Sequence, residues 1–149
     1  MSKRGSGAAK AFVAGGKNDP AMKPIDRNSL PKLEGTPKQV AWAQDIRDEF
    51  IKSEIVKTQK MYKEGIDALK EYKKTSPEKY KEEKERREYL ASGRRAYIEA
   101  ARIILNNTKS AKKIIDSRKY LGDVVSEVAD AVEKKKTREQ IKSIIADWM

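Results

Sequence analysis

The strongest constraint on the fold is a complete helix-start signal at residues 36–39, followed by an apolar stripe. Thr36 can cap the first free amide groups, Pro37 stands where its missing N–H costs nothing, and Gln39 can reach back to the cap. The next apolar residues recur every three to four positions: Val40, Ala43, Ile46 and Phe50, with Trp42 beside them. This pattern predicts a long amphipathic helix. We expect it to continue through Gly65 to about residue 73, and a break at that glycine is the alternative.

The same kind of helix start occurs twice more. Residues 75–78 combine a hydroxyl cap, a proline and an acid, and predict a second long helix. The first half of that helix is nearly all charged, whereas its second half carries apolar residues at helical spacing: Leu90, Tyr97, Ile98, Ala101, Ile104 and Leu105. Thr137–Gln140 is another capping box, which begins a short C-terminal helix. We therefore expect the two long helices to form an antiparallel hairpin.

Shorter helices are indicated between these landmarks. Asn106–Thr108 is typical of a helix end followed by a new cap, with a short helix from about Lys109. Gly122 indicates a turn, and the apolar stripe after it ends at Lys134–Lys136, where lysines suit a helix C-terminus. The predicted fold is all-α: a small bundle of four to five helices. Its predicted core includes one residue or more from each long helix: Trp42, Ile46, Phe50, Tyr97, Ile104 and Ile115.

The first 29 residues have a different composition from the rest. They are rich in Gly, Ala, Ser, Lys and Asn and show no helical or strand period, which predicts a disordered basic arm. Lys3 and Arg4 belong either to a solubilising tail or to an arm that touches nucleic acid. Residues 30–149 are then expected to form a single helical domain.

The composition narrows the function classes. The chain has no cysteine and no histidine, which excludes the usual nucleophile systems and nearly all zinc chemistry, so we predict no enzyme and no cofactor. The spacing of Asp45, Asp48 and Glu49 matches no metal-binding motif, so we predict no metal. There is no apolar run of about 20 residues and no secretion signal, so we expect a cytoplasmic protein with no membrane partner.

The positive charge points to a polyanion partner. Lys and Arg number 34 against 23 Asp and Glu, for a formal net charge of +11, and DNA or RNA is the partner class that such a charge favours. Tyrosines alternate with cations over residues 70–97, a composition that nucleic-acid surfaces use. A solvated helix with acid–base pairs four residues apart, here Glu82 with Arg86 and Glu83 with Arg87, has the same composition. The candidate contacts are all cationic: Arg86, Arg87, Arg94, Arg95, Lys134, Lys135, Lys136, Lys3 and Arg4.

Two short signatures stand out in residues 30–119. The first is Leu30-Pro31, Gly35-Thr36, Lys38-Gln39, Trp42-Ala43 and Ile46-Arg47. The second is Thr108, Ala111, Ile114, Ile115-Asp116 and Arg118. Together they resemble a helical module of uncharacterised proteins from bacteriophages and mobile elements of Firmicutes, whose pattern has tryptophan at the position of Ile114. The resemblance covers residues 30–119 and leaves 120–149 as a C-terminal helical extension. It implies a phage or mobile-element setting and a helical fold, and no catalytic residue.

Two functional hypotheses follow from these observations. The first is a non-enzymatic nucleic-acid-binding accessory protein of a phage or mobile element. The second is a protein-binding module, such as an anti-CRISPR-like inhibitor of a host defence nuclease, or a virion component. Arg47 and Arg118 fit either structural ion pairs or phosphate ligands. Leu90, Tyr97 and Ile104 have heptad spacing, which fits core packing and leaves a homodimer open.

Overall fold

The computed structural model describes residues 12–148. Two 3-10 turns, η1 (Pro20–Met22) and η2 (Arg27–Ser29), precede the helices. The helices are α2 (Pro37–Phe50), the π-helical segment η3 (Ile51–Ile55), α3 (Val56–Thr75), α4 (Pro77–Asn107), α5 (Ala111–Ser117), α6 (Leu121–Glu133) and α7 (Arg138–Trp148). Within residues 12–148 the only β-type pairing is an isolated bridge between Glu34 and Ser110. The all-α prediction is therefore confirmed.

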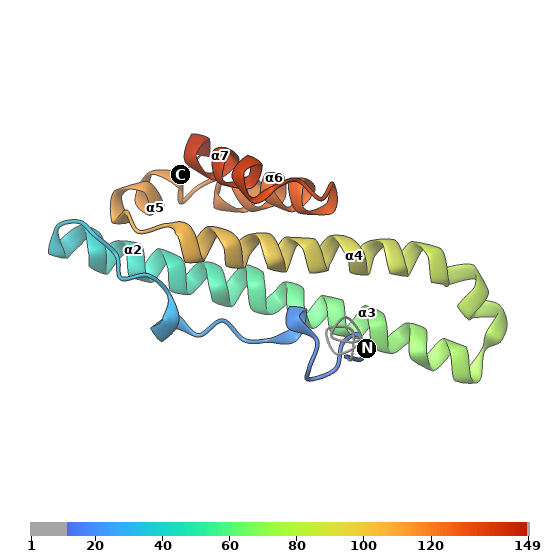
Figure 1. Cartoon of the computed structure of the whole chain (residues 1–149). Coiled ribbons are helices and arrows are strands. Elements are labelled where there is room, and N and C mark those ends of the chain that lie inside the picture. Colours follow the sequence, from blue (N-terminus) through green and yellow to red (C-terminus); the bar gives the residue numbers. More distant parts are fainter. Residues whose placement is uncertain (1–11, 149) are drawn as a thin grey trace, which may run out of the picture.

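The two long helices form the predicted antiparallel hairpin. α2, η3 and α3 run on as one rod, and α4 returns along it, while α6 and α7 cover the outer side of α4 (Figure 1). The rod passes through Gly65 without a break, as expected. Pro77 occupies the first turn of α4, although the Ser76 side chain makes no capping hydrogen bond. When the rod is counted as one helix, the described residues contain five helices: the rod, α4, α5, α6 and α7. This is the upper end of the predicted range of four to five.

The π-helical segment in the middle of the rod was not predicted. Here the Val56 N–H donates to the Ile51 carbonyl, five residues earlier. The wider turn takes up one extra residue, so the apolar face changes phase between α2 and α3. Consecutive residues Phe50 and Ile51 are consequently both buried, at 7% and 6% exposure. Single π turns of this kind occur frequently beside functional sites.

The main apolar core lies among the rod, α4, α5, α6 and α7. α4 contributes small residues to it, with Ala100 and Ala101 fully buried, which lets the neighbouring helices approach closely. Of the predicted core residues, Phe50, Ile104 and Ile115 are buried, and Ile46 and Tyr97 are half-buried against the core. A smaller cluster joins the N-terminal segment to the hairpin through Ala21, Tyr62, Ala91 and Ile98.

The prediction that Trp42 is buried is wrong. Its side chain is 49% exposed. The buried face of α2 is centred on Ala43, Arg47 and Phe50, and successive helical residues point about 100° apart. Trp42 therefore stands at the edge of that face and turns toward solvent.

The predicted disorder of residues 1–29 is wrong for residues 12–29. Residues 1–11, including Lys3 and Arg4, lie outside the described part. Asp19 is fully buried, and its carboxylate accepts hydrogen bonds from the Gly15 and Ala21 amides and from the Tyr62 hydroxyl at 2.9, 3.0 and 2.6 Å. Further along, Gln59 donates to the Ala21 and Lys23 carbonyls at 3.1 and 2.8 Å. We call residues 12–29 the N-terminal strap, because it runs along the hairpin (Figure 1).

Two capping boxes are confirmed and two boundaries are corrected. Thr36 with Gln39, and Thr137 with Gln140, exchange the expected pairs of hydrogen bonds. The cap of α5 is Ser110, whose hydroxyl accepts from the Lys113 amide, and not Thr108. Thr108 is buried and donates to the Ile104 carbonyl at 2.7 Å instead. Gly122 lies inside the first turn of α6, because the turn comes at residues 118–120.

Candidate functional site

The two signatures identified in the sequence lie side by side. The Glu34 amide donates to the Lys109 carbonyl at 2.7 Å, and the Ala111 amide donates to the Glu34 carbonyl at 2.9 Å. Gly35 adjoins this bridge with φ +156°, and a Cβ there would lie 3.1 Å from the Ala111 Cβ and 3.0 Å from the Gln39 Oε1 that caps α2. A side chain at position 35 would therefore disturb both the bridge and the helix cap.

The two arginines of these signatures have different surroundings. Arg47 is 7% exposed and donates to the Pro31 carbonyl at 3.0 Å, so it holds the start of the signature onto α2. Its burial excludes a role as a phosphate ligand. The guanidinium of Arg118 lies 4.9 Å from the centre of the Trp42 ring and donates to the Ile115 carbonyl at 2.6 Å. A cation over an indole face is a favourable contact, and it connects α2 to the end of α5.

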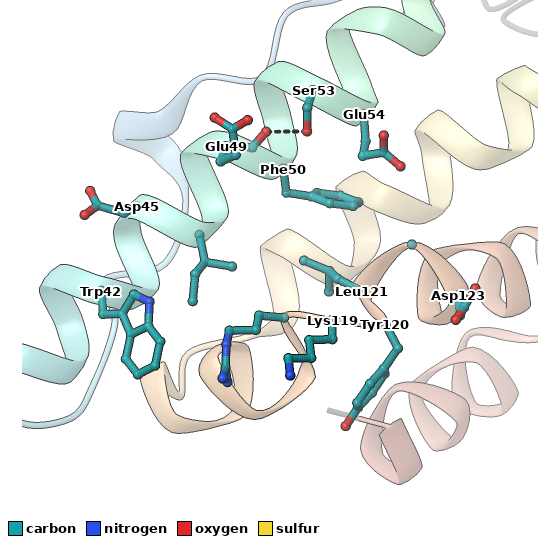
Figure 2. Close-up of a pocket in the computed structure, with 13 residues that line it drawn as sticks. Trp42, Asp45, Glu49, Phe50, Ser53, Glu54, Lys119, Tyr120, Leu121 and Asp123 are labelled. Carbon is teal, nitrogen blue, oxygen red and sulfur yellow. Dashed lines mark hydrogen bonds between the residues drawn. The ribbon is translucent and has the colours of Figure 1, made fainter.

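Beside this contact a groove opens between α2 and the start of α6. It has a volume of about 770 Å³. Figure 2 shows Phe50 of α2 and Leu121 of α6 pointing toward one another, with Trp42 and Tyr120 at two edges of the hollow. Asp45, Glu49 and Glu54 come from the α2–η3 side, and Lys119 and Asp123 from the other. The π-helical segment contributes Ser53 and Glu54, so the unusual turn forms part of the groove wall.

A second hollow of about 550 Å³ continues the groove between α3, α4 and α6. The two hollows share Glu54, Gly122 and Asp123. Burial, together with the charge and hydrogen bond of Glu54 and the charge of Asp123, raises the pKa of Tyr97 to about 12. Tyr97 therefore stays a neutral hydrogen-bond partner of Glu54 at physiological pH. Met61 and Tyr89 line this half and are 40% and 74% exposed.

A separate basic hollow lies at the end of the molecule where α5 and α7 meet. It has a volume of about 470 Å³, and Lys109, Lys113 and Lys142 line it together with Glu34. Within residues 12–148 none of these three lysines forms an ion pair. Residues 107–120 hold five cationic side chains and one acidic one. We call this surface, defined by the three lysines, the basic end.

Several cations that were predicted to bind nucleic acid make contacts within the protein. Arg94 donates to the Met61 carbonyl at 3.3 Å. Arg95 hydrogen-bonds the Tyr62 hydroxyl and lies 3.9 Å from the buried Asp19 carboxylate. Arg86 and Arg87 both pair with Glu83, at 3.0 and 3.2 Å, and these hydrogen bonds lower the pKa of that carboxyl group. The predicted partner of Arg86 was Glu82.

The lysine run after α6 terminates that helix. Lys134 pairs with Asp130 at 2.9 Å. Lys135 has a φ of +54°, and the amides of Lys135 and Lys136 donate to the Val132 and Ala131 carbonyls. This is the hydrogen-bond pattern of a Schellman motif, with lysine where glycine is usual. The run therefore has a structural role at its backbone, and its side chains face solvent.

Sequence reasoning missed both the groove and the basic end. Lys109, Lys113 and Lys142 had no common signal, because Lys142 lies 29 residues beyond Lys113 and only the packing of α7 brings them together. Leu90 and Tyr97, two of the three heptad-spaced residues, line the groove, but no local pattern indicates that Trp42 and Met61 are exposed.

Comparison with known proteins adds no template for this arrangement. No protein-family model matches the chain, and the searches of curated proteins and of solved structures also found no match. None of the described helices has both the length and the apolar character needed to cross a membrane. Within residues 12–148 no group of three or more acidic side chains is arranged to hold a metal ion. The groove and the basic end are therefore the two candidate functional surfaces of the described chain.

Proposed function

We propose that the protein binds nucleic acid without catalysis and that the basic end is its contact surface. The observation that supports this proposal is the convergence of Lys109, Lys113 and Lys142 around one hollow, each exposed and without an ion pair in the described chain. Lysines without an internal partner are available to phosphates, whereas Arg87 and Arg95 already have partners. The surface predicted from the sequence comprised the arginines of the hairpin, the lysine run after α6 and the N-terminal arm, whereas the surface proposed here lies at α5 and α7.

The mechanism is electrostatic. Each phosphate that a lysine neutralises releases condensed counterions, so affinity falls as salt concentration rises. Each contact makes the slope of log affinity against log salt more negative by about 0.9 on duplex DNA and about 0.7 on single strands. Such contacts carry no sequence information by themselves. The setting that we propose is the one that the resemblance implies, an accessory protein of a phage or mobile element in the cytoplasm of a bacterial host.

The test compares two triple variants that have the same change in net charge. Lys109→Gln/Lys113→Gln/Lys142→Gln removes the basic end. Lys74→Gln/Lys81→Gln/Lys84→Gln removes three exposed lysines at the far tip of the hairpin. Fluorescence anisotropy with single-stranded and duplex oligonucleotides is measured over a salt series. We expect the slope of log affinity against log salt to become less negative by about 2 to 3 in the first variant and to stay close to the parent value in the second.

Two results would contradict the proposal. Absence of binding by the parent protein at low salt would exclude nucleic acid as the ligand. An equal loss in both variants would mean that net charge alone drives binding, without a defined surface. Circular dichroism of each variant checks that the helices are retained.

A further inference from the structure

A second surface, which the proposed nucleic-acid function does not use, is the groove between the rod and α6. Its two hollows share three residues and therefore run on as one groove. Along the rod the groove extends from Trp42 to Met61, which at 1.5 Å per residue is about 28 Å. A helix of about five turns has that length. The dimensions thus match one helical segment of a partner and are large for a small metabolite.

The groove concentrates the exposed apolar side chains of the protein. The described residues expose six large apolar side chains, and four of them line this groove: Trp42, Met61, Tyr89 and Tyr120. Phe50 and Leu121, which are largely buried, line the floor of the groove between them (Figure 2). Exposed apolar side chains are usually scattered singly over a protein surface. Several large ones gathered along a groove are typical of a protein-binding site.

The charge of the groove is opposite to that of the whole molecule. Its lining includes five carboxylates, Asp45, Glu49, Glu54, Asp123 and Glu133, and none forms an ion pair within residues 12–148. The lining also includes three cations, Arg94, Arg118 and Lys119, so its carboxylates outnumber its cations by two. A protein of net charge +11 therefore presents here a surface that repels phosphates and attracts lysine and arginine.

We propose that this groove binds an amphipathic helix of a partner protein, with apolar residues on one face and Lys or Arg beside them. In this mode the partner places apolar residues at positions i, i+3, i+4 and i+7 on the rings of the groove, and its cations meet the carboxylates at the rim. The proposal is independent of nucleic-acid binding at the basic end. A second copy that docked its own basic end in this groove would make a head-to-tail contact, which repeats into a ring or an open chain.

The test is a selection of peptides by the full-length protein. A displayed library of 20-residue helix-forming peptides is selected on the parent and counter-selected on Asp45→Lys/Glu49→Lys. We expect the enriched peptides to carry Lys or Arg beside an apolar stripe of helical period. Synthesised peptides should bind the parent and lose at least tenfold in affinity for Asp45→Lys/Glu49→Lys and for Trp42→Ala. Glu71→Lys/Glu82→Lys, with the same charge change at the hairpin tip, should keep the parent affinity.

Three results would contradict the proposed occupant of the groove, each in a different way. Enrichment of acidic peptides, or of no common sequence class, overturns the proposal. Self-association of the parent that disappears in Asp45→Lys/Glu49→Lys would make a second copy the occupant. Displacement of the bound peptide by an oligonucleotide would make the groove part of the nucleic-acid surface. Thermal unfolding of every variant shows that lost binding does not come from lost structure.

Discussion

At the scale of single residues, Asp19 has the most constrained environment. Burial alone raises the pKa of its carboxyl group, but hydrogen bonds from Tyr62, Gly15 and Ala21 and the charge of Arg95 outweigh this effect, so the pKa lies below the usual value. The same hydrogen bond to Asp19 adds to burial in raising the pKa of Tyr62. One carboxylate thus holds the N-terminal strap against both long helices.

Replacing Asp19 should weaken the fold in a pH-dependent way. Asp19→Asn is expected to lower the free energy of unfolding by about 2 to 3 kcal/mol at neutral pH, because hydrogen bonds to a buried charge are lost. A depressed pKa stabilises the folded state above the unfolded pKa of about 3.9, and this contribution is lost as pH falls through the folded pKa. The stability difference between parent and variant should therefore be constant above about pH 5 and narrow as pH falls from there through the folded pKa, measured by urea unfolding.

The control for this prediction is Asp26→Asn on the same strap. Asp26 is exposed, and its carboxylate accepts a hydrogen bond from the Asn28 amide at 3.0 Å, which an asparagine side chain can also accept. Its effect should be about 0.5 kcal/mol or less. An equal effect at both positions would show that the buried network is not what stabilises the strap.

At the scale of elements, the strap behaves as an additional layer on the hairpin. It supplies Ala21 to the smaller apolar cluster and two carbonyls to the buried Gln59 amide. Arg102 of α4 also donates to the Pro20 and Lys23 carbonyls. Gly15, with φ +76°, packs so closely that a Cβ would lie 3.2 Å from the Ile66 side chain. Contacts of this kind predict that the strap contributes to stability.

Two truncations measure this contribution. Removal of residues 1–29 should lower the free energy of unfolding by about 2 to 6 kcal/mol, since Gln59 and Tyr62 lose buried partners and each such loss costs about 1 to 3 kcal/mol. Removal of residues 1–11 keeps every contact described above and serves as the matched control. Chemical denaturation of both chains distinguishes the outcomes. Equal stability of the two would mean that residues 12–29 act as the detached arm first expected from the sequence.

At the scale of the whole molecule, the two proposed surfaces have opposite charge and separate linings. The basic hollow is lined by Glu34, the end of α4, the loop before α5, and residues of α5 and α7, whereas the groove is lined by the rod, the middle of α4, the turn at residues 118–120 and α6. The two hollows of the groove share no lining residue with the basic hollow. Binding at one surface therefore does not require the other.

Separate surfaces predict separable losses of binding. The triple glutamine variant at Lys109, Lys113 and Lys142 should lose oligonucleotide affinity and keep the affinity for a selected basic peptide. Asp45→Lys/Glu49→Lys should lose the peptide and keep the oligonucleotide. Substitutions at distant, independent sites act additively within about 0.5 kcal/mol. The variant that combines all five substitutions should therefore lose each ligand by the same amount as the corresponding single-surface variant, measured by anisotropy. Loss of both ligands in either single-surface variant would indicate one shared site.

The sequence by itself determined the helical class, the hairpin and two of the helix starts. These features depend on hydrogen bonds and spacings within three or four residues, such as the exchange between Thr36 and Gln39. A periodic apolar stripe likewise identifies a helix without knowledge of what covers it. Phe50, Ile104 and Ile115 were found in the core for this reason.

Tertiary structure alone decided which side chains are available to a partner. Tyr62 meets Asp19 across 43 residues, and Lys142 joins Lys113 only where α7 packs beside α5. Trp42 shows the limit of local patterns. An apolar stripe gives the direction of the buried helix face to within about one residue, and only the packing of neighbouring helices decides which residue at its edge is exposed. Exposure, pairing and the groove arise from the placement of whole helices, and local sequence patterns do not encode that placement.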